Sequence, residues 1–199
     1  VGRLAPEKNL QVLIAAYEAM RARQPRAKLV FVGDGPARAV LQARCPEAVF
    51  AGTRTGGDLA AHYASGDLFL FPSLTETFGN VTIEAMASGL AVVAYDYAAA
   101  AAHIAHGRSG LLAPYDKPEE FVRLCTDLVV APGLIAELGR EARRVADGLD
   151  WGHVVLQLED LFMAALQAGE LARLAAPQDS RHSRHYGRKN PQRPQGSLG

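Results

Sequence analysis

Two carboxylates eight residues apart, Glu76 and Glu84, are the side chains whose types and spacing best suit chemistry in this chain. Glu76 lies in a polar loop after the apolar run 68–71, and Glu84 lies inside the helical segment that follows. Ligands of open α/β sheets bind at the carboxyl ends of the strands, where this loop would lie. Between the carboxylates are Gly79 and the first N–H groups of the helix, which favour a bound anion. Because a carboxylate can accept hydrogen bonds from two adjacent hydroxyls, the arrangement suits a ligand with phosphate and vicinal diols, such as a sugar nucleotide.

Each of these residues also has a plain structural explanation. Alone, Glu84 is an exposed helix charge, Glu76 is a solvated loop residue and Gly79 is a tight turn. The order of the surrounding elements favours the functional interpretation. A strand, a Pro-Ser pair, the loop, a Phe-Gly pair, the helix, a glycine and a second strand follow one another.

The stretch 68–95, which carries both carboxylates, is predicted to form one strand–helix–strand unit. Pro72 ends the first strand, since proline cannot donate to a sheet ladder. A helix follows over about residues 81–88, and Gly89 ends it, as glycine often does. The apolar run 91–94 is the next buried strand. Strands joined through a helix pair in parallel, so we expect a parallel sheet here.

The rest of the chain alternates between strands and helices in the same way. We expect further strands at residues 28–32, 48–51 and 110–113, and helices at 10–20, 37–44, 59–64, 98–106, 118–129, 133–147 and 151–166. Asn9 and Asp58 are expected to cap two of the helices, and Pro118 suits the first turn of another. The alternation predicts an α/β fold with a doubly wound, Rossmann-like parallel sheet of about six strands.

The segment 72–94, PSLTETFGNVTIEAMASGLAVVA, resembles the signature of retaining glycosyltransferases of family four. The resemblance extends to VGRLAPEKN at 1–9, VGDGP at 32–36 and HGRSGLL at 106–112, in the family's order and spacing. It covers about residues 1–165. The resemblance implies the two-domain glycosyltransferase-B fold, of which this chain is the C-terminal, donor-binding half.

The resemblance also assigns roles to charged side chains. Arg3 and Lys8 flank the loop between the first strand and its helix, where the family binds the diphosphate of the donor. A guanidinium binds phosphate through a planar fork and Lys supplies a compact charge, so the pair would neutralise the charge that grows as the glycosidic bond breaks. Without the resemblance, both are solvated loop cations. We expect neither to have an acidic partner at helical spacing, because Glu7 is adjacent to Lys8.

The other implied contacts surround the helix of the signature. Glu84 would hold the ribose hydroxyls, and Glu76 would touch the donor sugar. The backbone amides of a short run would meet the sugar and phosphates; this run is Phe78, Gly79, Asn80 and Val81. The loop after Gly52 would pass the base, with Arg54 as the backbone contact. The implied catalytic residues are Glu76, Arg3 and Lys8.

The resemblance implies no cofactor and no metal, with a GDP- or UDP-sugar as the donor. Consistent with this, the sequence has no Asp-x-Asp triplet to hold a metal. The six histidines are interpreted as ordinary packing, surface or tail residues.

Two features depart from the family pattern. The loop 53–57 differs from the family's apolar and acidic loop, and an alanine-rich run at 95–102 replaces a loop that normally contains two glycines near the donor sugar. The identity of the donor is therefore open. The signature with its alanine-rich run looks most like bacterial mannosyltransferases or glycolipid-forming members.

Composition and charge limit the remaining classes of function. The 199 residues carry 21 basic and 21 acidic side chains with no basic face in the body, which argues against nucleic acid as a partner. Cys45 and Cys125 lack metal-ligand spacing, which favours reduced thiols in the cytoplasm. No stretch could span a bilayer. Peripheral contact with the inner face of the membrane stays open.

The domain prediction is a donor-binding domain over 1–170 and a disordered basic tail over 177–199. The chain starts without Met, as a fragment would, and the resemblance implies that an N-terminal acceptor domain is missing and that this piece alone is inactive. Two alternatives stay open: a non-catalytic sugar-nucleotide binding module, and a nonhydrolysing sugar-nucleotide epimerase, which shares the two-domain architecture. The two cations together with the two glutamates favour the transferase over the epimerase.

Overall fold

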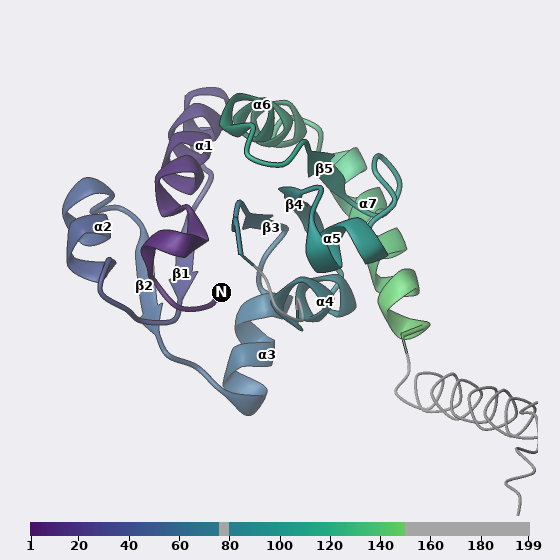
Figure 1. Ribbon diagram of the computed structural model, residues 1–199, viewed down its shortest axis with the longest axis horizontal. Helices are drawn as coiled ribbons and strands as arrows, with labels where there is room; N and C mark the ends of the chain where they lie inside the picture. Colours follow the sequence, from purple (N-terminus) through teal and green to yellow (C-terminus); the bar gives the residue numbers. More distant parts are fainter. Residues whose placement is uncertain (76–79, 150–199) are drawn as a thin grey trace, which may run out of the picture. The chain divides into compact units, whose positions relative to one another are not determined.

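A computed structural model describes residues 1–75 and 80–149 of the chain (Figure 1). The chain divides into two units, 1–151 and 152–199, and all the described residues belong to the first. The predicted helix at 151–166 and the predicted tail therefore lie outside the described residues. So do Glu76, Phe78 and Gly79 of the signature.

All strand pairs in the described residues are parallel, as the sequence predicts. β1 (Val30–Val32) pairs with β2 (Val49–Gly52), and a second sheet has the order β3-β4-β5, formed by Leu68–Phe71, Ala91–Tyr95 and Leu111–Ala113. Each of the five strands overlaps one of the five ranges that the sequence predicts. The expectation of a single sheet of about six strands is wrong for the described residues, which form sheets of two and three strands.

The chain start takes the place of a regular strand beside β1. The backbone N–H of Gly2 donates to the carbonyl of Val32 at 2.8 Å, and that of Leu4 donates to Asp34 at 2.9 Å. Gly33 makes the close approach feasible, because a Cβ at this position would lie 1.9 Å from the carbonyl oxygen of Gly2. The φ of Gly33, +135°, is also a value that glycine adopts readily. The glycine after β1 therefore lets the segment that carries Arg3 run alongside the sheet.

Within residues 1–75 and 80–149, eight helical segments connect or flank these strands. They are the 3₁₀ turn η1 (Pro6–Lys8), α1 (Leu10–Arg23), α2 (Arg38–Arg44), α3 (Gly56–Ala64), α4 (Asn80–Ala87), α5 (Ala98–His103), α6 (Pro118–Leu128) and α7 (Pro132–Asp147). Gly89, at φ +77°, follows the end of α4 and Pro118 begins α6, as predicted. The sequence therefore locates each described α-helix to within a few residues, whereas the turn η1 is not predicted.

The two predicted side-chain caps are not formed. Asn9 precedes α1 with φ 52° and its side chain makes no capping hydrogen bond. α3 begins at Gly56, two residues before Asp58, so Asp58 lies inside the first turn. Its carboxylate pairs instead at 3.1 Å with Arg54, which lies in the loop just before α3.

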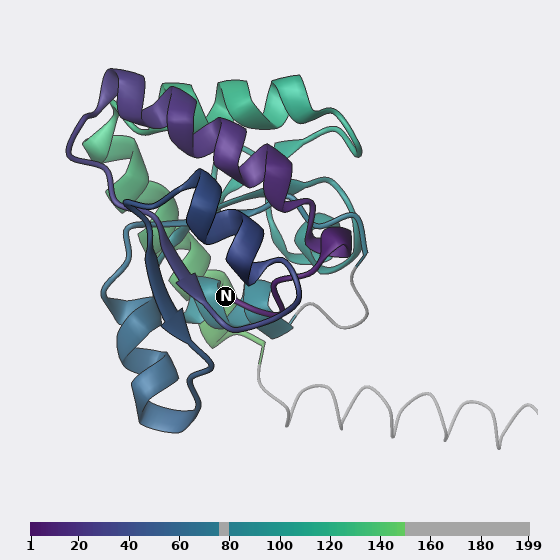
Figure 2. The same ribbon diagram turned by 90° about the vertical axis from the view of Figure 1, so that its left-hand side faces the viewer.

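The sheet β3-β4-β5 is covered on both faces because successive strand residues point to opposite sides. Val93 and Tyr95 of β4 pack with side chains of α1 and α6 such as Met20 and Phe121. Helices α1 and α6 lie side by side in both views (Figures 1 and 2). On the other face, Val92 and Ala94 pack with residues of α4 and α7. A helix–sheet–helix sandwich therefore presents the carboxyl ends of β3 and β4 at one edge.

Helix α1 also covers the smaller sheet. Its residues Leu13, Ile14 and Tyr17 pack with Phe31 of β1 and Leu41 of α2 in a separate core. One helix thus contributes to the cores under both sheets, which fixes η1, the turn that precedes it, relative to β3. No helix among the described residues is long and apolar enough to cross a membrane.

Candidate functional site

The loop after β3, which leads to Glu76, is docked at its start on two other segments. Ser73 is buried, and its hydroxyl donates to the carbonyl of Thr75 at 2.7 Å and lies 3.4 Å from the carbonyl oxygen of Glu7. The N–H of Leu74 donates to the same Glu7 carbonyl at 3.4 Å. The hydroxyl of Tyr115 donates to the carbonyl of Leu74 at 3.1 Å. These bonds place the loop against η1, the turn that ends at Lys8.

The side chain of Lys8 reaches the end of β3. Its Nζ lies 5.3 Å from the centre of the Phe71 ring, the last residue of that strand. An ammonium over an aromatic face is attracted by the ring quadrupole, with about 0.5–1 kcal/mol at exposed sites. The contact holds the Lys8 charge at the carboxyl end of β3, beside the loop that leads to Glu76.

Arg3 is exposed and has an acidic partner after all. Its Nη2 lies 3.6 Å from Oε1 of Glu7, four residues along the chain. The expectation that Arg3 lacks such a partner is wrong, because η1 turns the chain directly after Ala5 and brings residue 7 back toward residue 3. An exposed ion pair of this kind contributes about 0–1 kcal/mol, so a bound anion could compete with Glu7 for the guanidinium.

Glu84, on α4, accepts a hydrogen bond that the sequence does not predict. The hydroxyl of Tyr63 on α3 donates to Oε2 of Glu84 at 2.9 Å. Tyr63 is only 3% exposed, so its hydroxyl approaches the carboxylate from the protein interior. Burial first, and then the bond to Glu84, raise the pKa of Tyr63 far above its usual value. The phenol therefore stays protonated and remains a donor to the carboxylate.

The charges of Lys8 and Glu84 both act on the Val1 amino group. Burial first, and then the charge of Lys8, lower the pKa of this group to about 6, and the charge of Glu84 opposes the shift. A predicted cation and a predicted ribose-binding carboxylate, 76 residues apart in the sequence, therefore influence the same group.

A cavity of about 280 Å³ opens at the carboxyl ends of β1 and β2. Its lining consists of Val1, Gly2, Arg3, Val32, Gly33, Asp34, Thr53, Arg54 and Leu59. The cavity therefore brings together two of the predicted binding residues, Arg3 and Arg54. Arg54 is held by its own loop, since its Nε donates to the carbonyl of Ala51 at 2.9 Å and its Nη1 donates to Asp58 at 3.1 Å.

The amino terminus of α4 follows the loop after β3 in the chain. The helix begins at Asn80, which is exposed, and continues with Val81, which is half-buried. The first N–H groups of a helix have no partner within the helix, and they carry its positive partial charge. Such groups favour a bound anion, and the anion contact at Asn80 and Val81 stays a prediction.

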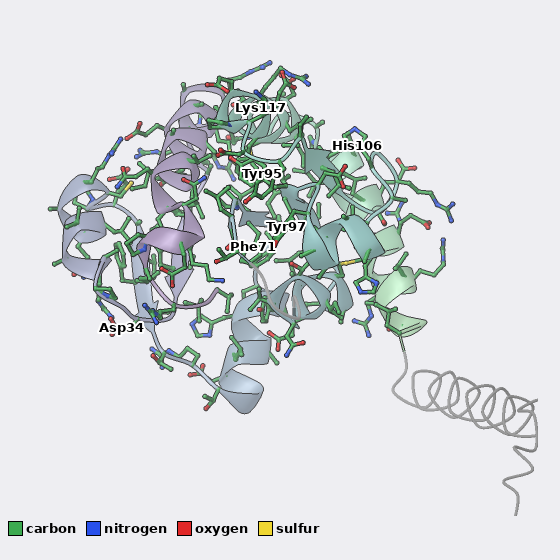
Figure 3. All side chains as sticks on the ribbon, viewed as in Figure 1. Asp34, Phe71, Tyr95, Tyr97, His106 and Lys117 are labelled. Atoms are coloured by element: carbon green, nitrogen blue, oxygen red, sulfur yellow. The ribbon has the colours of Figure 1, made fainter. Side chains whose placement is uncertain are left out.

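The alanine-rich run after β4 forms α5 with a strained first residue. Ala98 has φ 49°, a left-handed conformation that costs a residue with a Cβ roughly 1 kcal/mol and that glycine adopts freely. Tyr97, which precedes it, lies at the rim of a cavity of about 10 Å³ between the ends of β3 and β4. Figure 3 labels Phe71, Tyr95 and Tyr97, all of which line that cavity. The conformation explains why a loop of this kind normally contains glycines.

The family model described as glycosyl transferases group 1 matches residues 1–130 of the chain. This chain belongs to the glycosyl transferases group 1 family. Its residues are 44% identical over 148 positions to a GDP-mannose-dependent alpha-mannosyltransferase of Mycobacterium tuberculosis, an alignment of 73% of this chain and 35% of that protein. They are 33% identical over 168 positions to a D-inositol 3-phosphate glycosyltransferase of Rhodococcus jostii, covering 77% of this chain and 37% of that protein.

A solved structure shares the fold of this group 1 glycosyltransferase chain. It is Anabaena Alr3699/HepE in complex with UDP, with a TM-score of 0.71 at 24% identity over 82% of this chain and 47% of that one. The fold is therefore the Rossmann-like domain of a glycosyltransferase-B protein. The chain spans little more than a third of the two curated relatives described above.

In this glycosyltransferase chain, the structure brings some of the described predicted site residues together and leaves others apart. Arg3 and Arg54 line one cavity, Lys8 lies over Phe71 at the end of β3, and Glu84 is bonded to Tyr63. Tyr63 is the residue that sequence reasoning missed. The one feature of the sequence that could have indicated Tyr63 is its aromatic side chain in the predicted helix 59–64. The same feature is equally typical of a core residue.

The histidines in the described part of the chain have local roles. The ring Nδ1 of His106 accepts the N–H of Leu112 at 3.0 Å, and Nδ1 of His62 lies 2.7 Å from the carbonyl oxygen of Asp58. These contacts agree with the interpretation of both as packing or surface residues. Among residues 1–75 and 80–149, no three His, Cys, Asp or Glu side chains gather in a way that could hold a metal ion. Cys45 and Cys125 are both buried thiols without a disulfide.

Proposed function

We propose that this chain is the donor-binding part of a retaining glycosyltransferase, which moves a sugar from a nucleoside-diphosphate sugar to an acceptor held by an N-terminal domain. One observation carries the proposal. Lys8, in the turn before α1, holds its ammonium 5.3 Å from the ring centre of Phe71 at the carboxyl end of β3, the strand from which the chain continues to α4 and Glu84. A cation and a carboxylate at the amino terminus of a helix match the phosphate and the diol of a nucleotide.

In this proposal each part of the donor has its own contacts. The ribose hydroxyls donate to Glu84, while the diphosphate accepts from the backbone at Asn80 and Val81 and pairs with Arg3 and Lys8. Glu76, Phe78 and Gly79 contact the sugar and phosphates, as the signature implies. The base lies at the loop that carries Arg54, where the cavity of about 280 Å³ has room for it.

The chemical contribution of the two cations is to stabilise the leaving group. As the bond between the sugar and the diphosphate breaks, negative charge grows on the leaving oxygens. Arg3 and Lys8 would neutralise that charge from fixed positions, without a metal ion. Fixed charges aimed at developing charge are an effective source of rate acceleration, because little reorganisation is needed at the moment of reaction.

We further propose a mannosyl donor carried by GDP, and a sugar or lipid acceptor. The support is the 44% identity with the mycobacterial GDP-mannose-dependent alpha-mannosyltransferase. UDP stays the second candidate, because a protein of the same fold is solved with UDP. A cytoplasmic location, with contact at the inner face of the membrane, would bring the enzyme to a lipid acceptor. The relatives compared here are named transferases, which favours neither the binding module nor the epimerase.

A chimera tests the transferase function. Residues 1–149 replace the matching segment of the Mycobacterium tuberculosis relative, and transfer of labelled mannose from GDP-mannose is followed, with the anomeric configuration of the product read by NMR. We expect transfer with retention at the anomeric carbon. A folded chimera that binds GDP but transfers no sugar from GDP- or UDP-sugars would contradict the proposal.

A further inference from the structure

Tyr63 lies between α3 and the carboxylate to which the proposed function assigns the ribose. It is 3% exposed, and its ring packs on that of Phe69 of β3 with centres 6.1 Å apart. From this fixed position its hydroxyl donates to Oε2 of Glu84 at 2.9 Å and lies 3.5 Å from the carbonyl oxygen of Val81. The side chain that bonds Glu84 is therefore itself held by the core.

The two partners differ in exposure. Glu84 is exposed on α4, whereas the phenol that it accepts from is buried. An exposed glutamate normally samples several rotamers and loses that freedom when it binds a ligand. A hydrogen bond from a rigid donor removes part of the freedom beforehand. The carboxylate has about four lone-pair sites, so one bond from Tyr63 leaves acceptor capacity for two ligand hydroxyls.

We propose that Tyr63 is a positioning residue, which orients the Glu84 carboxylate to accept both hydroxyls of the donor's ribose. The inference rests on the proposed function, since it concerns the ribose contact of that site. Tyr63 touches Glu84 and not the donor. Its effect on affinity should therefore depend on two things: the presence of the Glu84 carboxylate, and the presence of the ribose hydroxyls on the ligand.

A purely structural role predicts a different pattern. If the bond only ties α3 to α4, its loss lowers the stability of the fold and weakens every ligand alike. If the bond orients Glu84, its loss weakens ligands with ribose hydroxyls and spares ligands without them. A comparison of ligands with and without ribose hydroxyls therefore distinguishes the two roles, whatever the change in the stability of the fold.

The test is calorimetric binding to the 199-residue chain and its variants. The ligands are GDP and UDP, each compared with its 2′,3′-dideoxy analogue. Tyr63→Phe removes only the hydroxyl, and we expect it to weaken GDP or UDP binding roughly three- to tenfold, which corresponds to the net contribution of one typical hydrogen bond. The dideoxy analogue should bind Tyr63→Phe and the parent equally.

Two further variants complete the cycle. In a Glu84→Ala background, Tyr63→Phe should have no further effect, because its target is gone. Tyr17→Phe is the matched control: Tyr17 is 2% exposed and its hydroxyl lies 3.5 Å from the carbonyl oxygen of Ala27, in the core under β1 and β2. It should leave every affinity unchanged.

The outcomes are distinct. Equal weakening of ribose and dideoxy ligands by Tyr63→Phe, or no weakening at all while Glu84→Ala weakens GDP, overturns the positioning role and leaves the proposed function standing. If the parent binds neither GDP nor UDP, or if Glu84→Ala binds them as the parent does, the ribose site itself is wrong and both proposals fall.

Discussion

At the scale of single residues, Glu84 is the side chain that we propose to bind the ribose of the nucleotide. Its carboxylate is exposed to ligand on one side and bonded to Tyr63 on the other. Substituting it removes a charged acceptor from the surface of α4 and also takes the acceptor from the buried Tyr63 hydroxyl. The substitution should therefore lower nucleotide affinity and, through Tyr63, also lower the stability of the fold.

The first prediction is that Glu84→Ala weakens the binding of GDP or UDP to the chain by about 1.5–3 kcal/mol, the cost of losing a hydrogen bond to a charged group. Isothermal calorimetry measures the affinity, and thermal melting checks the fold. Glu18→Ala, an exposed glutamate of α1, is the control and should change neither. If Glu84→Ala bound nucleotide as tightly as the parent, Glu84 would not be the residue that binds the ribose.

Most of the candidate residues could be named from the sequence because they belong to short motifs. The loop residues Arg3 and Lys8 and the helix residue Glu84 each sit at a position that the signature marks. Tyr63 could not be named, because its role depends on the packing of α3 against α4, and an aromatic residue on a helix face usually serves only the core. The ion pair between Arg3 and Glu7 could not be predicted, because η1 is a separate tight turn and not part of the helix that follows.

At the scale of elements, the glycine after β1 is what allows the cation-bearing segment to reach the site. Gly33 touches the backbone of Gly2 at a distance that no side chain permits. Larger residues there would push residues 1–4 away from β1. That movement would displace Arg3 and open the cavity that it shares with Arg54.

The second prediction is that Gly33→Ala destabilises the chain by at least about 2 kcal/mol, the sum of backbone strain at positive φ and overpacking against Gly2. Urea unfolding measures the loss. Gly57→Ala is the control, because a Cβ there meets nothing within 4 Å. A Gly33→Ala chain as stable as the Gly57→Ala chain would show that the close approach does not matter.

Secondary structure was predictable at this scale because strands and helices alternate and are bounded by glycine and proline. The pairing of the strands into sheets was harder to predict. Strands of three to five residues have few ladder bonds, so the grouping into sheets of two and three depends on tertiary packing. The predicted cap at Asp58 does not form for a similar reason. Arg54 and His62 lie close to the Asp58 carboxylate and compete with the N–H groups at the start of α3 for it.

At the scale of the whole described unit, buried phenols couple stability to alkaline pH. Burial first, and then the charges of Asp116 and Glu119, raise the pKa of Tyr95 to about 12. The unfolded value is near 10. Below pH 10 the phenol is protonated in both states, so its contribution is fully present. Between pH 10 and 12 the unfolded state loses the proton first and binds fewer protons, so the free energy of unfolding falls with rising pH.

The third prediction follows from this sign. Urea unfolding should show a stability that declines between pH 10 and 12, and Tyr95→Phe should make the decline shallower because one of the responsible groups is gone. Tyr97→Phe, which removes the hydroxyl of a 42% exposed tyrosine, is the control and should leave the slope unchanged. Parallel profiles for the parent and Tyr95→Phe would show that Tyr95 does not couple to folding.

The central claim is that Arg3 and Lys8 together neutralise the departing diphosphate without a metal ion. It is tested in the chimera with the Mycobacterium tuberculosis relative, where the transfer rate at saturating GDP-mannose can be measured. The variants are Lys8→Ala, Arg3→Ala, Arg3→Lys and, as a control on an exposed lysine, Lys28→Ala, each measured with and without a chelator.

The account predicts that the parent and Lys28→Ala keep full activity in the chelator. Lys8→Ala and Arg3→Ala should lose about 10²–10³ in rate, the usual effect of removing one group that stabilises transition-state charge. Arg3→Lys should recover only part of the loss, since an ammonium cannot reproduce the planar fork. A parent that stops in the chelator, or a Lys8→Ala chimera that transfers mannose at the parent's rate, would contradict the account.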